Sequence, residues 1–118
     1  MGDFSFPGHY HLRRPADFQS VYRSGAKRLS HGLVVYRLPN SCGHPRLGLS
    51  VSRKFGGAVQ RNRLKRLIRE AVRLNRVSWK IGGADIVVIA RKGAKRYGYL
   101  NVSTDLSKIF SKYGDGES

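Results

Sequence analysis

Hydrophobic and polar positions along the chain follow two different periods, which predict both helices and strands. Apolar residues recur at helical spacing in three segments and alternate, or run together as β-branched stretches, in three others. The helical pattern covers Pro15–Arg23, Ala58–Asn75 and Val102–Lys112. The strand pattern covers Leu33–Leu38, Arg46–Arg53 and Asp85–Arg91. This order of helix, strands, long helix, strand and helix predicts an α+β fold with one mixed sheet.

The helix predicted at 58–75 has a divided surface. At about 100° per residue, one apolar stripe contains Leu64, Leu67, Ile68, Ala71 and Val72. The opposite side gathers amide and basic groups, namely Asn62, Lys65, Arg69, Arg73 and Arg76. Around its margins, Arg61 lies near the seam, Arg66 at the far edge and Arg63 to one side. A helix that packs one face on its own domain and exposes guanidinium groups on the other is suited to binding phosphates.

The net charge of the chain indicates what kind of molecule it binds. The 118 residues include 23 Lys and Arg against 7 Asp and Glu, a net charge of +16. Such an excess indicates a polyanionic partner, for which nucleic acid is the first hypothesis and an acidic membrane surface the alternative. The longest apolar run, Ile86–Ala90, is far too short to span a bilayer. Cys42 is the only cysteine, which suits a reducing cytoplasm.

The length indicates a single domain covering residues 1–118. Within it we expect a flexible arm at 1–11, because Gly, Pro and aromatic residues mix there without a period. Residues 12–113 form the expected RNA-binding core, and 114–118 the expected flexible tail.

A longer string of residues resembles a known family. The stretch Arg46–Ala71, RLGLSVSRKFGGAVQRNRLKRLIREA, closely resembles the signature of the bacterial ribonuclease P protein subunit. At its centre is the triplet Arg61-Asn62-Arg63, followed by Lys65, Arg66 and Arg69, with Ala58 upstream. The segments ADFQSVYRSG and DIVVIARKGA resemble the flanking segments of the family in the right order. The resemblance covers most of the chain, from roughly Leu12 to Lys112.

The resemblance implies a fold and a role. The fold is similar to that of ribosomal protein S5: an α+β domain whose mixed four-stranded sheet packs with about three helices. Its βαβ crossover is left-handed, against the general right-handed default. The family is the protein cofactor of a ribozyme that removes the 5′ leader from precursor tRNA, an endonuclease reaction carried by the RNA subunit. The implied partners are ribonuclease P RNA and precursor tRNA, with no membrane and no protein partner. Mg²⁺ is expected in the holoenzyme, held by RNA, and no cofactor is bound by the protein itself.

Basic residues around the long helix are the candidate contacts for the catalytic RNA. A solvated charged face is the alternative, but Glu70 is the only acid there, so the arginines mostly repel one another. The RNA-binding candidates are Arg53, Lys54, Arg61, Asn62, Arg63, Lys65, Arg66, Arg69 and Arg73. For Asn62 two interpretations stay open, either a hydrogen bond to a 2′-hydroxyl or base edge, or a cap of its own helix.

Aromatic residues supply the candidate contacts for the leader. Phe18 and Tyr22 are one helical turn apart, and Tyr36 lies on a strand that can face them; core packing is the alternative for all three. Val21, on the same helix face, is the better core candidate. The resemblance maps the three aromatic residues onto a cleft for single-stranded RNA, where bases stack on exposed rings. The cleft candidates are Phe18, Tyr22, Tyr36, Ser50, Ser52, Arg91 and Lys92.

The sequence offers little for chemistry by the protein itself. The histidines form no metal-ligand spacing with Cys42, and no carboxylate pair is available for acid–base work. The expected active site is therefore RNA. A structural ribosomal or general RNA-binding protein of the same fold is the alternative. A stand-alone nuclease lacks the cluster it would need.

Overall fold

A four-stranded sheet forms the middle layer of the structure, a computed structural model that describes residues 10–116. Its strands are β1 (Ala26–Leu29), β2 (Leu33–Pro39), β3 (Arg46–Ser50) and β4 (Ala84–Ala90). They lie in the order β1-β2-β4-β3, in which β3 and β4 are parallel and the other neighbours antiparallel. The mixed α+β sheet predicted from the sequence is confirmed.

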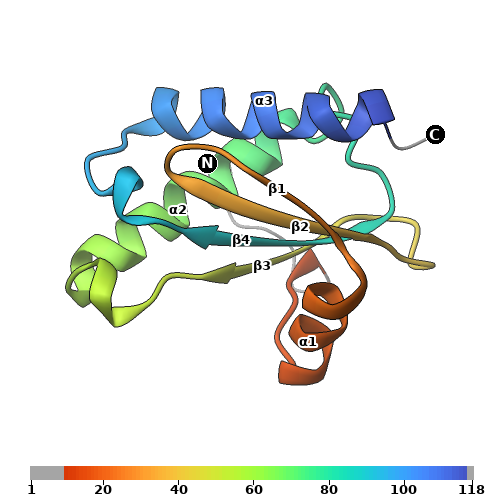
Figure 1. Ribbon diagram of the computed structural model, residues 1–118, viewed down its shortest axis with the longest axis horizontal. Coiled ribbons are helices and arrows are strands. Elements are labelled where there is room, and N and C mark those ends of the chain that lie inside the picture. The colour runs from red at the N-terminus through yellow and green to blue at the C-terminus, as the bar shows by residue number, and fades with distance from the viewer. Residues whose placement is uncertain (1–9, 117–118) are drawn as a thin grey trace, which may run out of the picture.

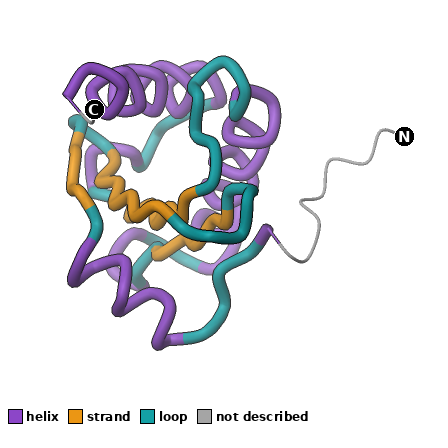
Figure 2. The backbone as a smooth tube through the Cα atoms, turned by 90° about the vertical axis from the view of Figure 1, so that its right-hand side faces the viewer, coloured by secondary structure: helices purple, strands orange, loops and turns teal. Residues whose placement is uncertain are grey.

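Helices cover the two faces of this sheet unequally. The helices are α1 (Pro15–Ser24), α2 (Ala58–Asn75) and α3 (Tyr99–Gly116). Figure 1 shows α3 above the sheet and α1 below it, and Figure 2 shows the same layers from the side. The larger core lies between the sheet and the pair α2 and α3. A small cluster of Leu12, Val21 and Val87 holds α1 on the opposite face, so Val21 is the core residue of its helix, as expected.

The crossover from β3 through α2 to β4 joins neighbouring parallel strands. Helix α2 lies on the same side of the sheet as α3, so the chain returns from the end of β3 to the start of β4 over that face (Figures 1 and 2). With β3 and β4 parallel and β3 at the edge of the sheet, this path makes the crossover left-handed. This agrees with the family resemblance and differs from the general default. The crossover leaves β3 at the edge of the sheet, next to the basic helix.

The limits of α2 follow from local chemistry. The apolar stripe is buried at Leu64, Ile68, Ala71 and Val72, as its period predicts. Before the first turn, the Gly57 N–H donates a hydrogen bond to Gln60 Oε1 at 2.9 Å. Gln60 therefore satisfies the amide next to the helix start. The interpretation of Asn62 as the helix cap is wrong, because Asn62 lies in the second turn, where its side chain is exposed.

Several boundaries differ from the sequence prediction. Strand β3 ends at Ser50 instead of Arg53, because the chain turns through a short 3-10 helix (Arg53–Phe55) that buries Phe55 in the larger core. Helix α3 begins three residues early, at Tyr99, where the Gly98 N–H donates to Asn101 Oδ1 at 2.9 Å. A second 3-10 helix, Lys92–Ala94, follows β4.

The ends of the chain also differ from expectation. Part of the expected arm is anchored, because His11 pairs with Leu47 in an isolated parallel bridge and the Leu12 N–H donates to Leu47 O at 3.0 Å. Helix α3 continues to Gly116, three residues into the expected tail. The rest of the expected arm and tail, residues 1–9 and 117–118, lies outside the described residues.

Candidate nucleic-acid interface

A groove runs along the β3 edge of the sheet, between α1 and α2. It has a volume of about 270 Å³ and is lined by His11, Leu12, Arg13, Phe18, Leu47, Leu49, Lys65 and Arg69. We call it the β3-edge groove. Lys65 and Arg69 are one turn apart on α2, so the helix places both cations on the wall that faces Phe18 of α1. The groove therefore joins two members of the predicted basic set, Lys65 and Arg69, with one member of the predicted aromatic cleft, Phe18.

The two cations that α2 contributes to the β3-edge groove, Lys65 and Arg69, have no acidic partner among residues 10–113. Within the same range, neither side chain takes part in a hydrogen bond or ion pair. Burial, and secondarily the charge of Arg66, lowers the pKa of Arg69. An arginine nevertheless stays protonated at neutral pH. A half-buried guanidinium without a counter-charge has lost hydration that an incoming anion can replace.

Three other predicted RNA-binding residues, Arg61, Arg63 and Arg73, make local bonds within the protein. Arg61 Nε donates to Gly56 O at 3.2 Å, and Arg63 Nη1 donates to Tyr97 O at 2.9 Å. The Arg63 bond draws its side chain toward the start of α3 and away from the β3-edge groove. Arg73 pairs with Glu70 at 3.0 Å. The single bond of Arg61 and that of Arg63 each occupy only part of a guanidinium, whose five N–H donors leave others for phosphate.

The remaining basic candidates are exposed. Asn62 and Arg66 are exposed on the outer face of α2, and Arg53 and Lys54 are exposed on the turn before it. The structure thus spreads the predicted set along α2 and its leading turn, and places only Lys65 and Arg69 inside a hollow.

Three aromatic rings form a row on the opposite face of the sheet, under and beside α1. The ring centroids of Phe18 and Tyr22 are 6.4 Å apart, and those of Tyr22 and Tyr36 are 5.1 Å apart. Tyr22 is 39% exposed, while Phe18 and Tyr36 are half-buried. None of the three belongs to the larger core. We call them the aromatic row, and its Phe18 end opens into the β3-edge groove.

Gly48 sets the depth of the aromatic row at its Phe18 end. A Cβ on Gly48 would lie 2.6 Å from Cζ of Phe18, closer than real contacts allow. The absence of a side chain at Gly48 therefore lets the ring lie directly on β3. Cross-strand register places Gly48, Val87 and Tyr36 in one line across the sheet, so a single strip of backbone supports both ends of the row.

The structure brings together only some of the polar residues predicted for the leader cleft, which are Ser50, Ser52, Arg91 and Lys92. Ser50 faces the α1 side of the sheet, opposite Ile89 on β4, and is half-buried. Ser52 lies beyond the end of β3 and is exposed, so its grouping with Ser50 on one strand face is wrong. Arg91 and Lys92 follow β4 at the same end of the sheet, and both are exposed. Arg91 Nη1 donates to Ser30 O at 3.1 Å.

Comparison with known proteins decides the family. A family model described as Ribonuclease P matches residues 6–114. The chain belongs to the ribonuclease P protein family. The ribonuclease P protein component of Clostridium kluyveri is 39% identical over 106 residues, which is 89% of this chain and 95% of that relative.

Solved structures of the family share this fold. The RNase P protein of Staphylococcus aureus aligns with a TM-score of 0.80 at 38% identity, covering 87% of this chain and 94% of that structure. The RNase P protein from Thermotoga maritima aligns with a TM-score of 0.78 at 35% identity, covering 86% of this chain and 96% of the other. The family and the fold implied by the resemblance are thus both confirmed. The contacts of individual residues with RNA stay predictions.

One part of the candidate site escaped the sequence prediction. Residues 11–13 line the β3-edge groove, yet residue 11 was expected in a flexible arm. This segment has no hydrophobic period and is placed by its bridge to the β3 edge. One signal was available in the sequence. The strand predicted before the basic helix has unpaired backbone groups if it lies at the edge of the sheet, and another segment of the chain can pair with them.

The described residues offer no donor set for a metal ion. Between residues 10 and 116, no three His, Cys, Asp or Glu side chains come together in a way that would hold one. None of the helices in the same range has the combination of length and apolarity needed to cross a membrane.

Proposed function

We propose that this chain is the RNA-binding subunit of a cytoplasmic ribonuclease P, and that it binds both the catalytic RNA and the 5′ leader of precursor tRNA. The observation that carries the proposal is the meeting, at the β3-edge groove, of the half-buried cations Lys65 and Arg69 with Phe18, the end of the aromatic row that continues to the exposed ring of Tyr22. Cations alone suit any polyanion. Cations beside stacking rings suit single-stranded RNA.

The catalytic RNA is assigned to α2 and the turn before it. The helix carries a divided surface, with the apolar stripe buried and the basic groups outward. Phosphate contacts by such groups release counterions, so they contribute strongly to affinity at low salt. The residues assigned to this contact are Arg53, Lys54, Arg61, Asn62, Arg63, Lys65, Arg66, Arg69 and Arg73.

The precursor leader is assigned to the aromatic row. Each base that stacks on an exposed ring contributes roughly 1–3 kcal/mol, and Tyr22 is the exposed ring of the row, with Phe18 and Tyr36 half-buried on either side of it. Ser50 supplies a hydroxyl beside the row, and Arg91 and Lys92 supply charge at the end of β4. Because α1 covers only part of this sheet face, a flexible single strand has access where a duplex does not.

In this proposal the chain's residues bind and orient RNA, and the cleavage chemistry belongs to the RNA subunit. Mg²⁺ in the holoenzyme is held by RNA phosphates, which the basic side chains help to position. The protein thus lowers the cost of aligning the leader next to the catalytic RNA.

Cleavage of precursor tRNA tests the proposal directly. A bacterial ribonuclease P RNA is assayed at physiological magnesium with and without the full chain. We expect the protein to stimulate cleavage strongly. No stimulation would refute the proposal, and cleavage by the protein without RNA would indicate a stand-alone nuclease.

Paired substitutions at Tyr22 test the leader assignment. Tyr22→Phe keeps the ring and Tyr22→Leu removes it, at a side chain that is 39% exposed. We expect Tyr22→Leu to weaken holoenzyme binding of precursor tRNA about 5-fold or more, since one stacked base is lost. Mature tRNA, which lacks a leader, serves as the control substrate. Equal losses for precursor and mature tRNA would contradict the leader assignment.

A further inference from the structure

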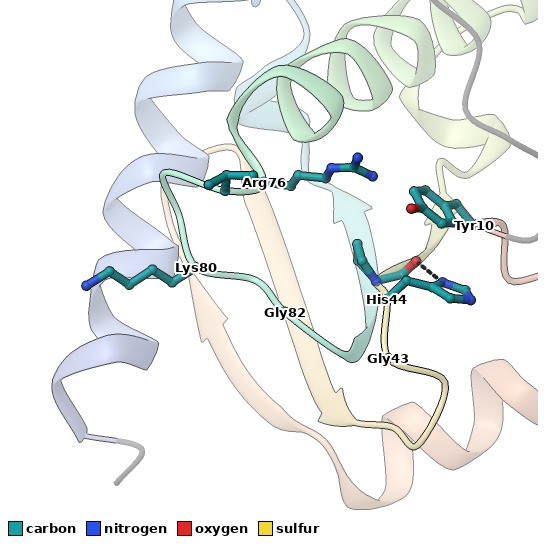
Figure 3. A pocket seen from close by; sticks show the side chains of 8 residues that line it. Tyr10, Gly43, His44, Arg76, Lys80 and Gly82 are labelled. Carbon is teal, nitrogen blue, oxygen red and sulfur yellow. Dashed lines mark hydrogen bonds between the residues drawn. The ribbon is translucent and has the colours of Figure 1, made fainter.

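A second hollow lies beyond the C-terminal end of α2, separate from the aromatic row. It has a volume of about 480 Å³ and is lined by Tyr10, Gly43, His44, Pro45, Arg76, Val77, Lys80 and Gly82. We call it the Tyr10 pocket. Figure 3 shows Arg76, Tyr10 and His44 arranged around it, while the side chain of Lys80 points away. Its volume is within the range of pockets that bind small ligands.

One wall of the Tyr10 pocket is a stacked aromatic pair. The rings of Tyr10 and His44 are 4.8 Å apart and inclined by 23°. His44 Nδ1 lies 3.0 Å from Pro45 O, and because a carbonyl only accepts, Nδ1 donates this bond and fixes the ring. The Arg76 guanidinium carbon lies 5.0 Å from the Tyr10 ring centroid. The side chain of Arg76 has no hydrogen-bond or ion-pair partner among residues 10–113.

The floor of the Tyr10 pocket is backbone held in place by a buried network. Gly43 and Gly82 both have positive φ, 82° and 64°, which a side chain would disfavour. Asn40 joins the two turns that carry them, since its N–H donates to Gly83 O at 2.9 Å. Its side-chain amide donates to His44 O at 3.2 Å and to Asp85 Oδ1 at 2.7 Å. The two turns that carry Gly43 and Gly82 are thus joined by hydrogen bonds within the protein.

The Tyr10 pocket continues the β3-edge groove. Tyr10 lines the pocket and the next residue, His11, lines the groove. Arg69 and Arg76 lie on the same flank of α2, two turns or about 10 Å apart along the helix axis. A strand of RNA that follows this flank therefore passes from one hollow to the other.

We propose that the Tyr10 pocket takes one unpaired nucleotide of a bound RNA, with its base against the Tyr10–His44 pair and its phosphate on Arg76. The inference rests on the proposed function and adds a binding site to it. An aromatic wall and a guanidinium that has no hydrogen-bond or ion-pair partner among residues 10–113 match the planar base and the anionic phosphate of a nucleotide. The nucleotide belongs either to the catalytic RNA or to the precursor leader.

Photochemical crosslinking tests the site and identifies the RNA. Ribonuclease P RNA and leader-bearing precursor tRNA are each substituted with 4-thiouridine, bound to the full chain and irradiated. We expect adducts in the peptides that contain Tyr10 or His44. The RNA that yields them is the source of the nucleotide. Adducts confined to α1 and to the part of α2 before Arg73 would overturn the inference.

Matched variants supply the energetic test. Tyr10→Phe keeps the ring and Tyr10→Leu removes it, while Arg76→Gln removes one charge and Lys108→Gln removes one from the exposed face of α3. We expect Tyr10→Leu to weaken RNA binding about 5-fold to 150-fold relative to Tyr10→Phe, and Arg76→Gln to weaken it more than Lys108→Gln. Equal affinities within each pair would overturn the inference.

The two proposals fail in different ways. If the unmodified protein binds neither RNA, the proposed function fails. If it binds and stimulates cleavage while the Tyr10 and Arg76 variants match their controls, only the nucleotide pocket fails.

Discussion

Removing the two cations that α2 contributes to the β3-edge groove should change how RNA affinity depends on salt. The perturbation is the double substitution Lys65→Gln and Arg69→Gln, which keeps side-chain length and helix propensity while removing two charges. Both side chains are half-buried beside Phe18 and neither has a partner within residues 10–113. Their loss therefore breaks no internal bond in the described part of the chain, and the protein should fold as before.

The size of the effect follows from counterion release. Each phosphate contact contributes about 0.7 to 0.9 to the slope of log affinity against log salt. Two lost contacts should therefore flatten the slope by about 1.4 to 1.8. Between 50 and 200 mM salt, an interval of about 0.6 log units, the variant should lose roughly 10-fold less affinity than the unmodified protein.

The assay is filter binding of ribonuclease P RNA across a salt series, with Lys108→Gln and Lys112→Gln together as control. Those two lysines are exposed on α3, so the control loses the same charge away from the groove. The control slope should match that of the unmodified protein. A double variant whose slope equals that of the control would refute the reasoning, because it would show that the groove cations contact no phosphate.

Three further substitutions test the support of the site. Gly48→Ala should push Phe18 off β3, lower the free energy of unfolding by about 1–3 kcal/mol and weaken leader binding without affecting mature tRNA. Asp85→Asn should cost up to about 3 kcal/mol in urea unfolding, because it breaks the ion pair of Asp85 with Arg46 at 2.7 Å. Hydrogen bonds from Arg46 and Asn40 outweigh burial and lower the pKa of Asp85. Its stabilisation is therefore present above the usual carboxyl pKa and lost as pH falls through the lower folded value, so acidification should destabilise the unmodified protein more than Asp85→Asn. Tyr113→Phe should lower the melting temperature by a few degrees, because the lost hydroxyl donates to Ala26 O and Val35 O.

Periodic segments were predictable from the sequence. The limits of α2 were predicted to the residue, because its apolar stripe and the glycines before it act within one segment. The start of α1 was also predicted, since Pro15 suits a first turn. Strand β1 had no prediction of its own, because its four residues, AKRL, include two cations and form no apolar alternation. It forms because the edge of β2 is available and Tyr113 donates to Ala26 O.

The candidate site was predictable where side chains share an element. Phe18 and Tyr22 lie one turn apart on α1, so their neighbourhood follows from helical spacing. The Tyr10 pocket was not predictable, because Tyr10, His44 and Arg76 come from three separate segments that only the tertiary fold brings together. The β3-edge groove likewise needs the bridge between His11 and Leu47, which depends on the strand order and on no local pattern.

The two faces of the sheet carry cores of unequal size, so the helices on one face are held more firmly than the helix on the other. Helix α2 rests on the large core, whereas α1 is held through the small cluster of Leu12, Val21 and Val87. Local opening costs least where few apolar contacts must be broken. Helix α1 can therefore shift against the sheet while α2 keeps its shape. If the proposed function holds, the basic surface on α2 would keep a fixed shape for a folded RNA, while the aromatic row would adjust to leaders of different sequence.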